Sequence, residues 1–248
     1  MFPTFTYADG YNFFLGIVSM IAIHTTINWW QTRRREYVYY ALYISCQWLF
    51  FALMRDDIVA RHSINETWLL SFTRPSSIIL YNIFAIEFLE LRKKSPWLYR
   101  CAVANILIAG AALLAMMWVH YLGMPDLARQ IIDTVKLVIF VLGLCVVMGI
   151  LRRADRTAKY FVMGSFFLIG LETANVVIGM VCHTTEGLNH LRHLSPDSIF
   201  SHPNFLTFFA VLSDLVCLSL GLVYRNHQIA MSKLRAQLEH QQIRIMTG

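Results

Sequence analysis

Residues 205–238 read FLTFFAVLSDLVCLSLGLVYRNHQIAMSKLRAQL and change from apolar to polar near Arg225. A helix formed by the first part, 205–225, would rise about 30 Å, which matches the hydrocarbon layer of a membrane. The polar part contains no proline and is rich in residues that favour helices. The stretch therefore predicts one helix that crosses a membrane and continues out of it.

Six further apolar blocks precede this one. Of the 248 residues, 57% are hydrophobic and 15% are charged, whereas soluble domains contain about 45–50% apolar and about 25% charged residues. This composition argues against a soluble enzyme, a DNA-binding domain or a disulfide scaffold. It predicts an all-α, polytopic membrane protein with a bundle of seven transmembrane helices. The predicted spans are 11–31, 36–54, 67–91, 97–120, 128–151, 158–182 and 205–225.

The basic residues indicate how these spans are oriented. They cluster at 33–35, 92–94, 152–159 and 225–235, after the first, third, fifth and seventh spans, while the opposite loops hold fewer basic residues and more acidic ones. Cytoplasmic loops of membrane proteins are enriched in Lys and Arg. The pattern predicts an outer N-terminus and a cytoplasmic C-terminus. It also attributes the net charge of +6 to membrane topology and not to nucleic-acid binding.

The polar tail carries a seam with heptad spacing, formed by His227, Met231, Leu234, Leu238, Gln241 and Ile245. We expect a parallel dimeric coiled coil here, because the tail has no partner in its own chain. An amphipathic helix lying on the membrane surface is the alternative. The predicted domains are a seven-helix sensor at 1–225 and a cytoplasmic signalling helix at 226–248. The seam residues expected to transmit a signal are Met231, Leu234, Leu238 and Ile245.

Three segments resemble a known family. A charged turn precedes YVYYALY at 37–43, FLELRKKSPWLYR occupies 88–100, and LSDLVCLSLGLVYRNHQIAMSKLRAQL occupies 212–238. In their order and spacing these segments resemble the bacterial seven-transmembrane receptors with diverse intracellular signalling modules. The resemblance extends over essentially the whole chain.

The resemblance implies a non-catalytic sensor in the bacterial inner membrane that controls a cytoplasmic output domain, commonly a histidine kinase of a two-component system or a diguanylate cyclase. That output domain would lie outside this sequence. Many members carry a sensory domain before the first span, and only about ten residues precede it here, so we expect the spans and outer loops to meet the stimulus. The expected partners are a second copy of the chain, joined through the last span and the tail, and a small ligand that is lipid-like or anionic. A response to the state of the membrane or periplasm is the other possibility.

Five ionisable residues fall inside the predicted spans: Arg74, Asp133, Lys136, Glu172 and Asp214. A charge at the centre of a membrane helix costs about 2.5–3.5 kcal/mol on insertion scales, so each residue needs a partner or a cavity. At 1.5 Å per residue, all five lie in the outer half of the membrane at similar depths. They are predicted to form a network that lines an outward-facing ligand pocket or acts as the switch. Polar contacts that only fix helix packing are the alternative.

Within this set, Arg74 precedes Pro75, which frees a backbone carbonyl and can bend the helix. A forked cation beside such a break can bind the polar head of an amphiphile. Asp133 and Lys136 are three residues apart on one predicted helix and can neutralise each other.

The outer loops hold most of the histidines. His183, His190 and His193 are close in sequence, and solvated side chains are the simplest interpretation, with pH sensing or weak metal binding as the alternative. No cofactor is expected, because His24 in the first span has no second mid-membrane histidine with which to share a haem.

Three other functions fit parts of the pattern. A retinal protein needs a lysine in the last span, and 205–225 contains none. A transporter would favour inverted repeats with paired broken helices, and only Pro75 interrupts a span. A membrane enzyme would need a reactive group near water, and Glu172 with Asp214 is the one plausible acid pair. A transporter or membrane-embedded enzyme that uses the five ionisable residues therefore remains the alternative to a receptor.

Overall fold

The computed structural model of the protein describes residues 7–53, 66–152, 156–184 and 205–247. All regular secondary structure in these ranges is helical, which confirms the all-α prediction. The elements are α1 (Tyr7–Thr32), α2 (Arg35–Leu53), α4 (Glu66–Phe88), α5 (Leu91–Lys94), α6 (Pro96–Tyr121), α7 (Pro125–Leu151), α8 (Arg156–Thr184) and α10 (Phe205–Thr247). Within the described ranges, every helix except the short α5 coincides with one of the predicted spans.

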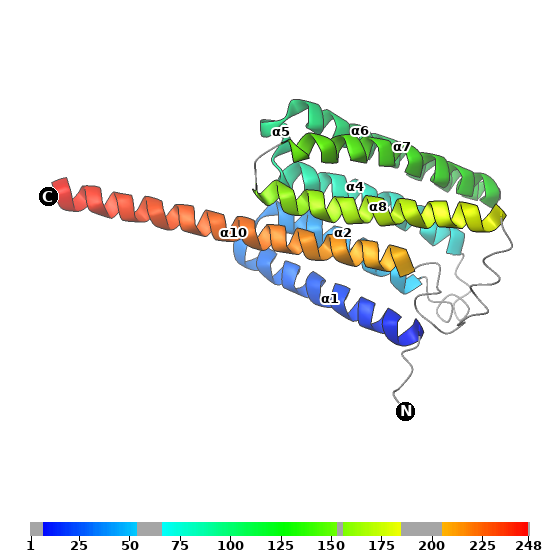
Figure 1. The fold of residues 1–248 in the computed structure, drawn as a ribbon, viewed down its shortest axis with the longest axis horizontal. Coiled ribbons are helices and arrows are strands. Elements are labelled where there is room, and N and C mark those ends of the chain that lie inside the picture. Colours follow the sequence, from blue (N-terminus) through cyan, green and yellow to red (C-terminus); the bar gives the residue numbers. More distant parts are fainter. Residues whose placement is uncertain (1–6, 54–65, 153–155, 185–204, 248) are drawn as a thin grey trace.

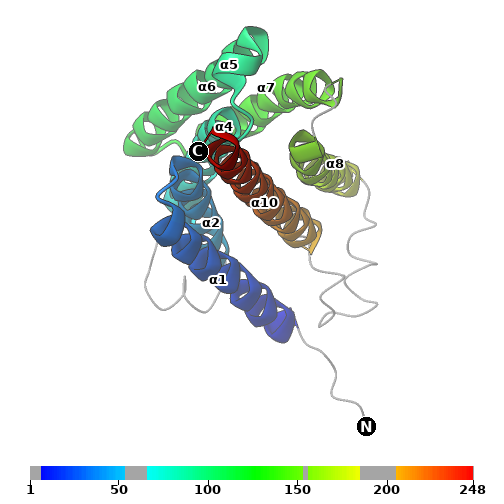
Figure 2. The same ribbon diagram turned by 90° about the vertical axis from the view of Figure 1, so that its left-hand side faces the viewer.

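Successive helices pack side by side in a ring. Contacts run from α1 through α2, α4, α6, α7 and α8 to α10, and α10 also touches α1. The helices lie roughly along one direction, as Figure 1 shows, and Figure 2 shows the same bundle from the end where α10 leaves it. Polar side chains that point into this ring can therefore meet from helices far apart in the sequence.

The outer surface of the bundle is apolar. By length and composition, the segments Asp9–Thr32, Pro96–Tyr121 and Leu206–Ile243 are each able to cross a membrane. Large apolar side chains on the outside are more than half exposed, among them Phe13, Met20, Leu107, Leu114 and Phe166. Helices that are apolar on their outer as well as their inner faces are typical of a lipid environment.

Turns on one side of the bundle are tight. α4 ends at Phe88, three residues before the predicted end of that span, because Glu90 adopts a left-handed conformation with φ of 51° that an α-helix does not continue through. Arg33, between α1 and α2, has φ of 54°. α6 then starts with Pro96 in its first turn, a position where proline is favoured.

Large buried side chains pack between α2, α4, α8 and α10. Tyr40, Phe84, Phe88, Phe161 and Leu215 are each at most 2% exposed. Burial of such large side chains favours a fixed packing of these four helices.

Two glycines allow close approach of helices around α10. A Cβ at Gly164 of α8 would lie 2.8 Å from Oδ1 of Asp214, so only glycine fits against α10 there. A Cβ at Gly221 of α10 would lie 3.1 Å from Phe88 of α4 and from Tyr160 of α8. Small residues at such contacts let helices in membranes pack closely.

α10 is a single helix of 43 residues. Its first half lies in the bundle and its second half projects well beyond it (Figure 1). Every residue from 230 to 243 is exposed. The same helix therefore links the buried core to a free surface.

Candidate ligand cavity and helix switch

A cavity of about 600 Å³ lies inside the ring, lined by residues of α2, α4, α6, α7, α8 and α10. This volume is in the range of about 300–1,000 Å³ that is typical of small-molecule sites. On α6 the lining residues are Ala102, Asn105, Ala109, Ala112 and Met116. Their spacing of three and four residues places them on one helix face. The three alanines leave room that larger side chains would fill.

One region of the cavity holds an ion pair. Nη1 of Arg74 on α4 lies 3.8 Å from Oε2 of Glu172 on α8, and both side chains are 28% exposed. The guanidinium carbon also lies 4.8 Å from the centre of the Phe50 ring, in cation–π contact. Both charged residues line the cavity. The structure thus brings together two of the five ionisable residues.

The helix remains continuous through the proline next to this pair. α4 includes Pro75 in its interior, and the Ser76 and Ser77 hydroxyls donate to the carbonyls of Phe72 and Arg74 at 2.7 and 2.8 Å. Pro75 and Ser77 themselves line the cavity. Because Pro75 has no backbone N–H, α4 lacks one helical hydrogen bond beside Arg74, which lines the cavity.

Asp133 and Lys136 are on α7, but their side chains are outside those that the structure describes. Their neighbours Thr134 and Val135 line the cavity. The predicted contact between Asp133 and Lys136, and their part in the network, therefore stays a prediction.

Asp214 forms a second, separate polar cluster. It is 0% exposed, and its Oδ2 accepts a hydrogen bond from the Tyr43 hydroxyl at 3.0 Å, while Oδ1 lies 3.4 Å from the Tyr81 hydroxyl. The Tyr81 hydroxyl is also 2.6 Å from Oγ of Ser165. These contacts join α2, α4, α8 and α10 at one point, which we call the Asp214 cluster.

The sequence placed Asp214 and Glu172 at similar depths, and the structure does not. The Asp214 cluster lies level with Ser165, seven residues before Glu172 on α8 and so about 10 Å away along the helix. The depths were counted from the outer ends of the helices as if those ends were level. α8 extends further than α10 at that end (Figure 1), so equal counts correspond to different heights.

Asn105, which lines the same cavity, has a buried amide. It is 3% exposed, and its Nδ2 lies 3.5 Å from Oδ1 of Asn82. Among the described residues, Oδ1 of Asn105 has no hydrogen-bond partner. A buried polar atom without a partner is costly, which makes this position a candidate contact for a ligand.

A third polar cluster holds α10 where it leaves the bundle. Arg225 donates to the Phe88 carbonyl at 2.5 Å and to Oε1 of Glu90 at 2.7 Å, and it lies 3.9 Å from Oε1 of Glu36. The next residue, Asn226, donates to the Tyr37 hydroxyl and accepts from Arg34 at 3.0 Å. We call this set the exit cluster. It ties α10 to α2 and to the end of α4.

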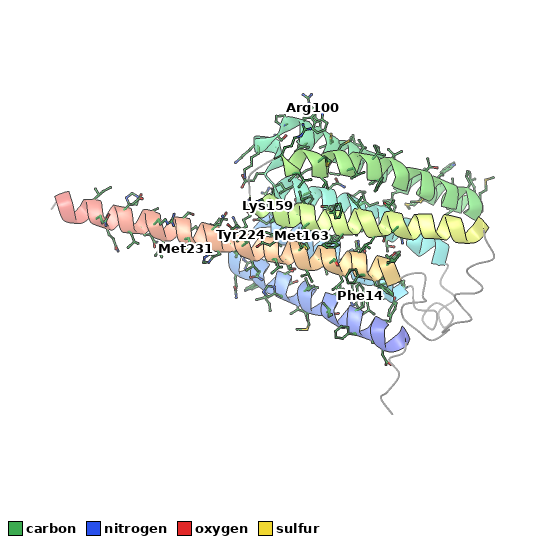
Figure 3. The ribbon with its side chains drawn as sticks, viewed as in Figure 1. Phe14, Arg100, Lys159, Met163, Tyr224 and Met231 are labelled. Carbon is green, nitrogen blue, oxygen red and sulfur yellow. The ribbon has the colours of Figure 1, made fainter. Side chains whose placement is uncertain are left out.

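The predicted seam lies beyond the exit cluster. Met231, Leu234 and Leu238 are 40%, 50% and 52% exposed, and Figure 3 shows Tyr224 near the end of the bundle and Met231 on the projecting part of α10. The side chain of Ile245 is not among those described. Met231, Leu234 and Leu238 therefore form an exposed apolar strip that has no cover within the described part of the chain.

The predicted weak metal site lies outside the described side chains. His183 is near the end of α8, and His190 and His193 fall in residues 185–204. No group of His, Cys, Asp or Glu that could hold a metal occurs among the residues that the structure describes.

Sequence reasoning missed several residues of these clusters. Taken singly, Tyr43, Tyr81 and Asn105 do not stand out from their apolar segments. Arg225 is interpreted from the sequence only as a signal of membrane orientation. A usable signal was present in α2, where Tyr37, Tyr40 and Tyr43 recur every three residues and so share one helix face. All three hydroxyls contact α10, through Asn226, Leu215 and Asp214.

Comparison with known proteins assigns the chain to a family. The family model described as 7TM diverse intracellular signalling matches residues 10–225. No curated protein and no solved structure matches the chain. The matched range extends over the helix bundle from residue 10 to Arg225 and includes the Arg74–Glu172 pair and the Asp214 cluster, and it confirms the resemblance seen in the sequence. The chain belongs to the 7TM diverse intracellular signalling family.

Proposed function

We propose that this chain is a receptor module of the bacterial inner membrane, in which a small anionic or lipid-like ligand enters the cavity and α10 carries the signal to a cytoplasmic output domain. The family is one of membrane signalling sensors. The output domain, a kinase or a diguanylate cyclase, would belong to a partner or to a further part of the protein. In this proposal seven helices span the membrane, with the N-terminus outside and the C-terminus in the cytoplasm.

The Arg74–Glu172 pair supports recognition of an anionic head. At 3.8 Å the two side chains are at ion-pair distance but beyond a hydrogen bond. A guanidinium has five donors in a fork that fits a carboxylate or phosphate. A ligand head can therefore compete with Glu172 for Arg74. When it does so, the link between α4 and α8 is released.

Movement of α8 would reach α10 directly. The two helices pack along much of their length, with Gly164 of α8 fitted against Asp214 of α10. The Asp214 cluster also connects this contact to α2 and α4. Because closely packed helices shift as units between discrete arrangements, loss of the Arg74–Glu172 link is expected to move α8 and α10 together.

The projecting half of α10 is proposed to dimerise through its seam. Met231, Leu234 and Leu238 are exposed, and a second copy of the same helix would bury them as a parallel coiled coil. A seam of this length is marginal alone, so small changes at the exit cluster can alter its register. Such sensitivity suits a switch.

The observation that carries this proposal is an internal cavity that contains a partly exposed arginine in a long ion pair with Glu172. Native mass spectrometry of the protein in nanodiscs tests it. We expect a dimer with a co-purified anionic or lipid-like compound, retained in Arg100→Ala and lost in Arg74→Ala. Arg100 is an exposed residue of α6 outside the cavity lining, so it is a matched control. Equal retention in both variants would refute the role of Arg74.

A further inference from the structure

Polar side chains of α4 line the cavity at several positions, from Arg74 through Ser77 and Tyr81 to Asn82. Arg74 and Asn82 both line it and are eight residues apart on the same helix, which corresponds to about 12 Å. Asn105 of α6 lies beside Asn82. The ion pair and the amide of Asn105 therefore lie beside two positions of α4 that are about 12 Å apart along its axis.

Apart from Ser77 and Tyr81 of α4, the wall between these positions is mostly apolar. It includes Ile78 of α4, Ala109 and Ala112 of α6, Ile139 of α7 and Ile169 of α8. An apolar wall favours a hydrocarbon segment, because each buried CH₂ group is removed from water. The shape and chemistry of the space suit one elongated molecule with a polar group near each end.

Asn105 decides what the second polar group is. Its Oδ1 is an acceptor without a hydrogen-bond partner in the described part of the chain, and the residue is 3% exposed. An alkyl chain ending there would leave this acceptor unsatisfied. A hydroxyl or an N–H group would donate to it.

We propose that the ligand is a single-chain amphiphile with an anionic head at Arg74 and a hydrogen-bond donor about 12 Å along its chain that binds Oδ1 of Asn105. This inference rests on the proposed function for the head site and adds the class of ligand. An extended chain advances about 3.5 Å for every three bonds, so the donor lies about ten bonds from the head. Asn105 is then the residue that distinguishes functionalised chains from plain alkyl chains.

Two simple fatty acids test this inference. We would measure binding of 10-hydroxydecanoate and decanoate to the protein in nanodiscs, subtracting partitioning into protein-free nanodiscs. A site that hydrogen-bonds a hydroxyl discriminates against the analogue that lacks it, and we expect roughly tenfold tighter binding of the hydroxy acid. In Asn105→Leu the preference should fall to about one. In Asn28→Leu, a change on α1 outside the cavity lining, it should persist.

Chain length provides a second measurement that needs no variant at Asn105. The advantage of a terminal hydroxyl should be largest near ten carbons and smaller for 6-hydroxyhexanoate and 14-hydroxytetradecanoate, because only the middle length matches the spacing. The inference would be overturned if the natural protein showed no preference for the hydroxy acid, or if the preference were unchanged in Asn105→Leu. The proposed function would still stand if both acids bound in an Arg74-dependent way. If neither acid binds in an Arg74-dependent way, the anionic head site and this inference both fail.

Discussion

Arg225 of α10 and Glu90, just after α4, form an ion pair of 2.7 Å at the point where α10 leaves the helix bundle. The same guanidinium donates to the Phe88 carbonyl and lies near Glu36. Arg225 therefore connects three parts of the chain at the base of the projecting helix. Any signal that passes along α10 must cross this contact.

Replacement of Arg225 by methionine should loosen the exit cluster. The change keeps an apolar stem of similar length but removes the hydrogen bond to the Phe88 carbonyl and the charged hydrogen bond to Glu90, for an expected loss of about 1–3 kcal/mol in the free energy of unfolding. A lowered thermal midpoint in nanodiscs is the measurement. Arg235→Met is the control, because Arg235 lies on the exposed part of α10. If both variants unfold at the same temperature as the natural protein, the exit cluster holds nothing together.

The Asp214 cluster makes a prediction about two hydroxyl groups. Tyr43→Phe removes the donor to Oδ2 of Asp214, and Tyr81→Phe removes the contacts to Oδ1 and to Ser165. Each change leaves a fully buried carboxyl group with fewer partners, and each should cost about 1–3 kcal/mol. Tyr99→Phe, at a partly buried tyrosine outside the cluster, should be close to neutral. The measurement is the midpoint of thermal unfolding of the three variants. Equal midpoints would show that the cluster does not stabilise the fold.

Two glycines on α8 give a matched pair. A Cβ at Gly164 meets Asp214 at 2.8 Å, whereas a Cβ at Gly170 meets nothing within 4 Å. Gly170→Ala should be neutral or stabilise the helix by up to about 1 kcal/mol. Gly164→Ala should instead lower the unfolding midpoint, because α8 and α10 must separate. The same response in both variants would mean that the close approach of these helices is not needed.

Much of the fold follows from the sequence, because apolar blocks of about twenty residues fix where helices form. The ends of the helices are harder to predict. α4 stops at Phe88 because Glu90 adopts a left-handed conformation, and nothing in the sequence around Glu90 indicates that turn. The relative depths of residues on different helices also do not follow from residue counts, because the helix ends are not level, as the separation of Asp214 from Glu172 shows. Contacts such as Asn105 with Asn82, or Arg225 with Glu90, depend on helix rotation, which a single sequence does not specify.

The proposed head site predicts how a change at Glu172 alters the affinity for an anionic ligand. Glu172→Gln removes the charge that competes for Arg74, so an anionic head should bind more tightly. Decanoate affinity in nanodiscs should rise several-fold in Glu172→Gln and fall in Arg74→Ala. Glu239→Gln, on the exposed part of α10, should leave it unchanged. Weaker decanoate binding in Glu172→Gln would indicate that Glu172 contributes to the site and does not compete with the ligand.

In the proposed mechanism, a change at the Arg74–Glu172 pair reaches the seam of α10. Cysteines placed singly at 231, 234 and 238, in a background without the native cysteines, would report it by disulfide crosslinking between two copies in native membranes. We predict strong crosslinks at these positions, weak ones at exposed 233 and 236, and a changed pattern when Arg74→Ala is added but not when Arg100→Ala is added. Absence of crosslinks at every seam position, or an identical pattern with and without Arg74, would contradict the account.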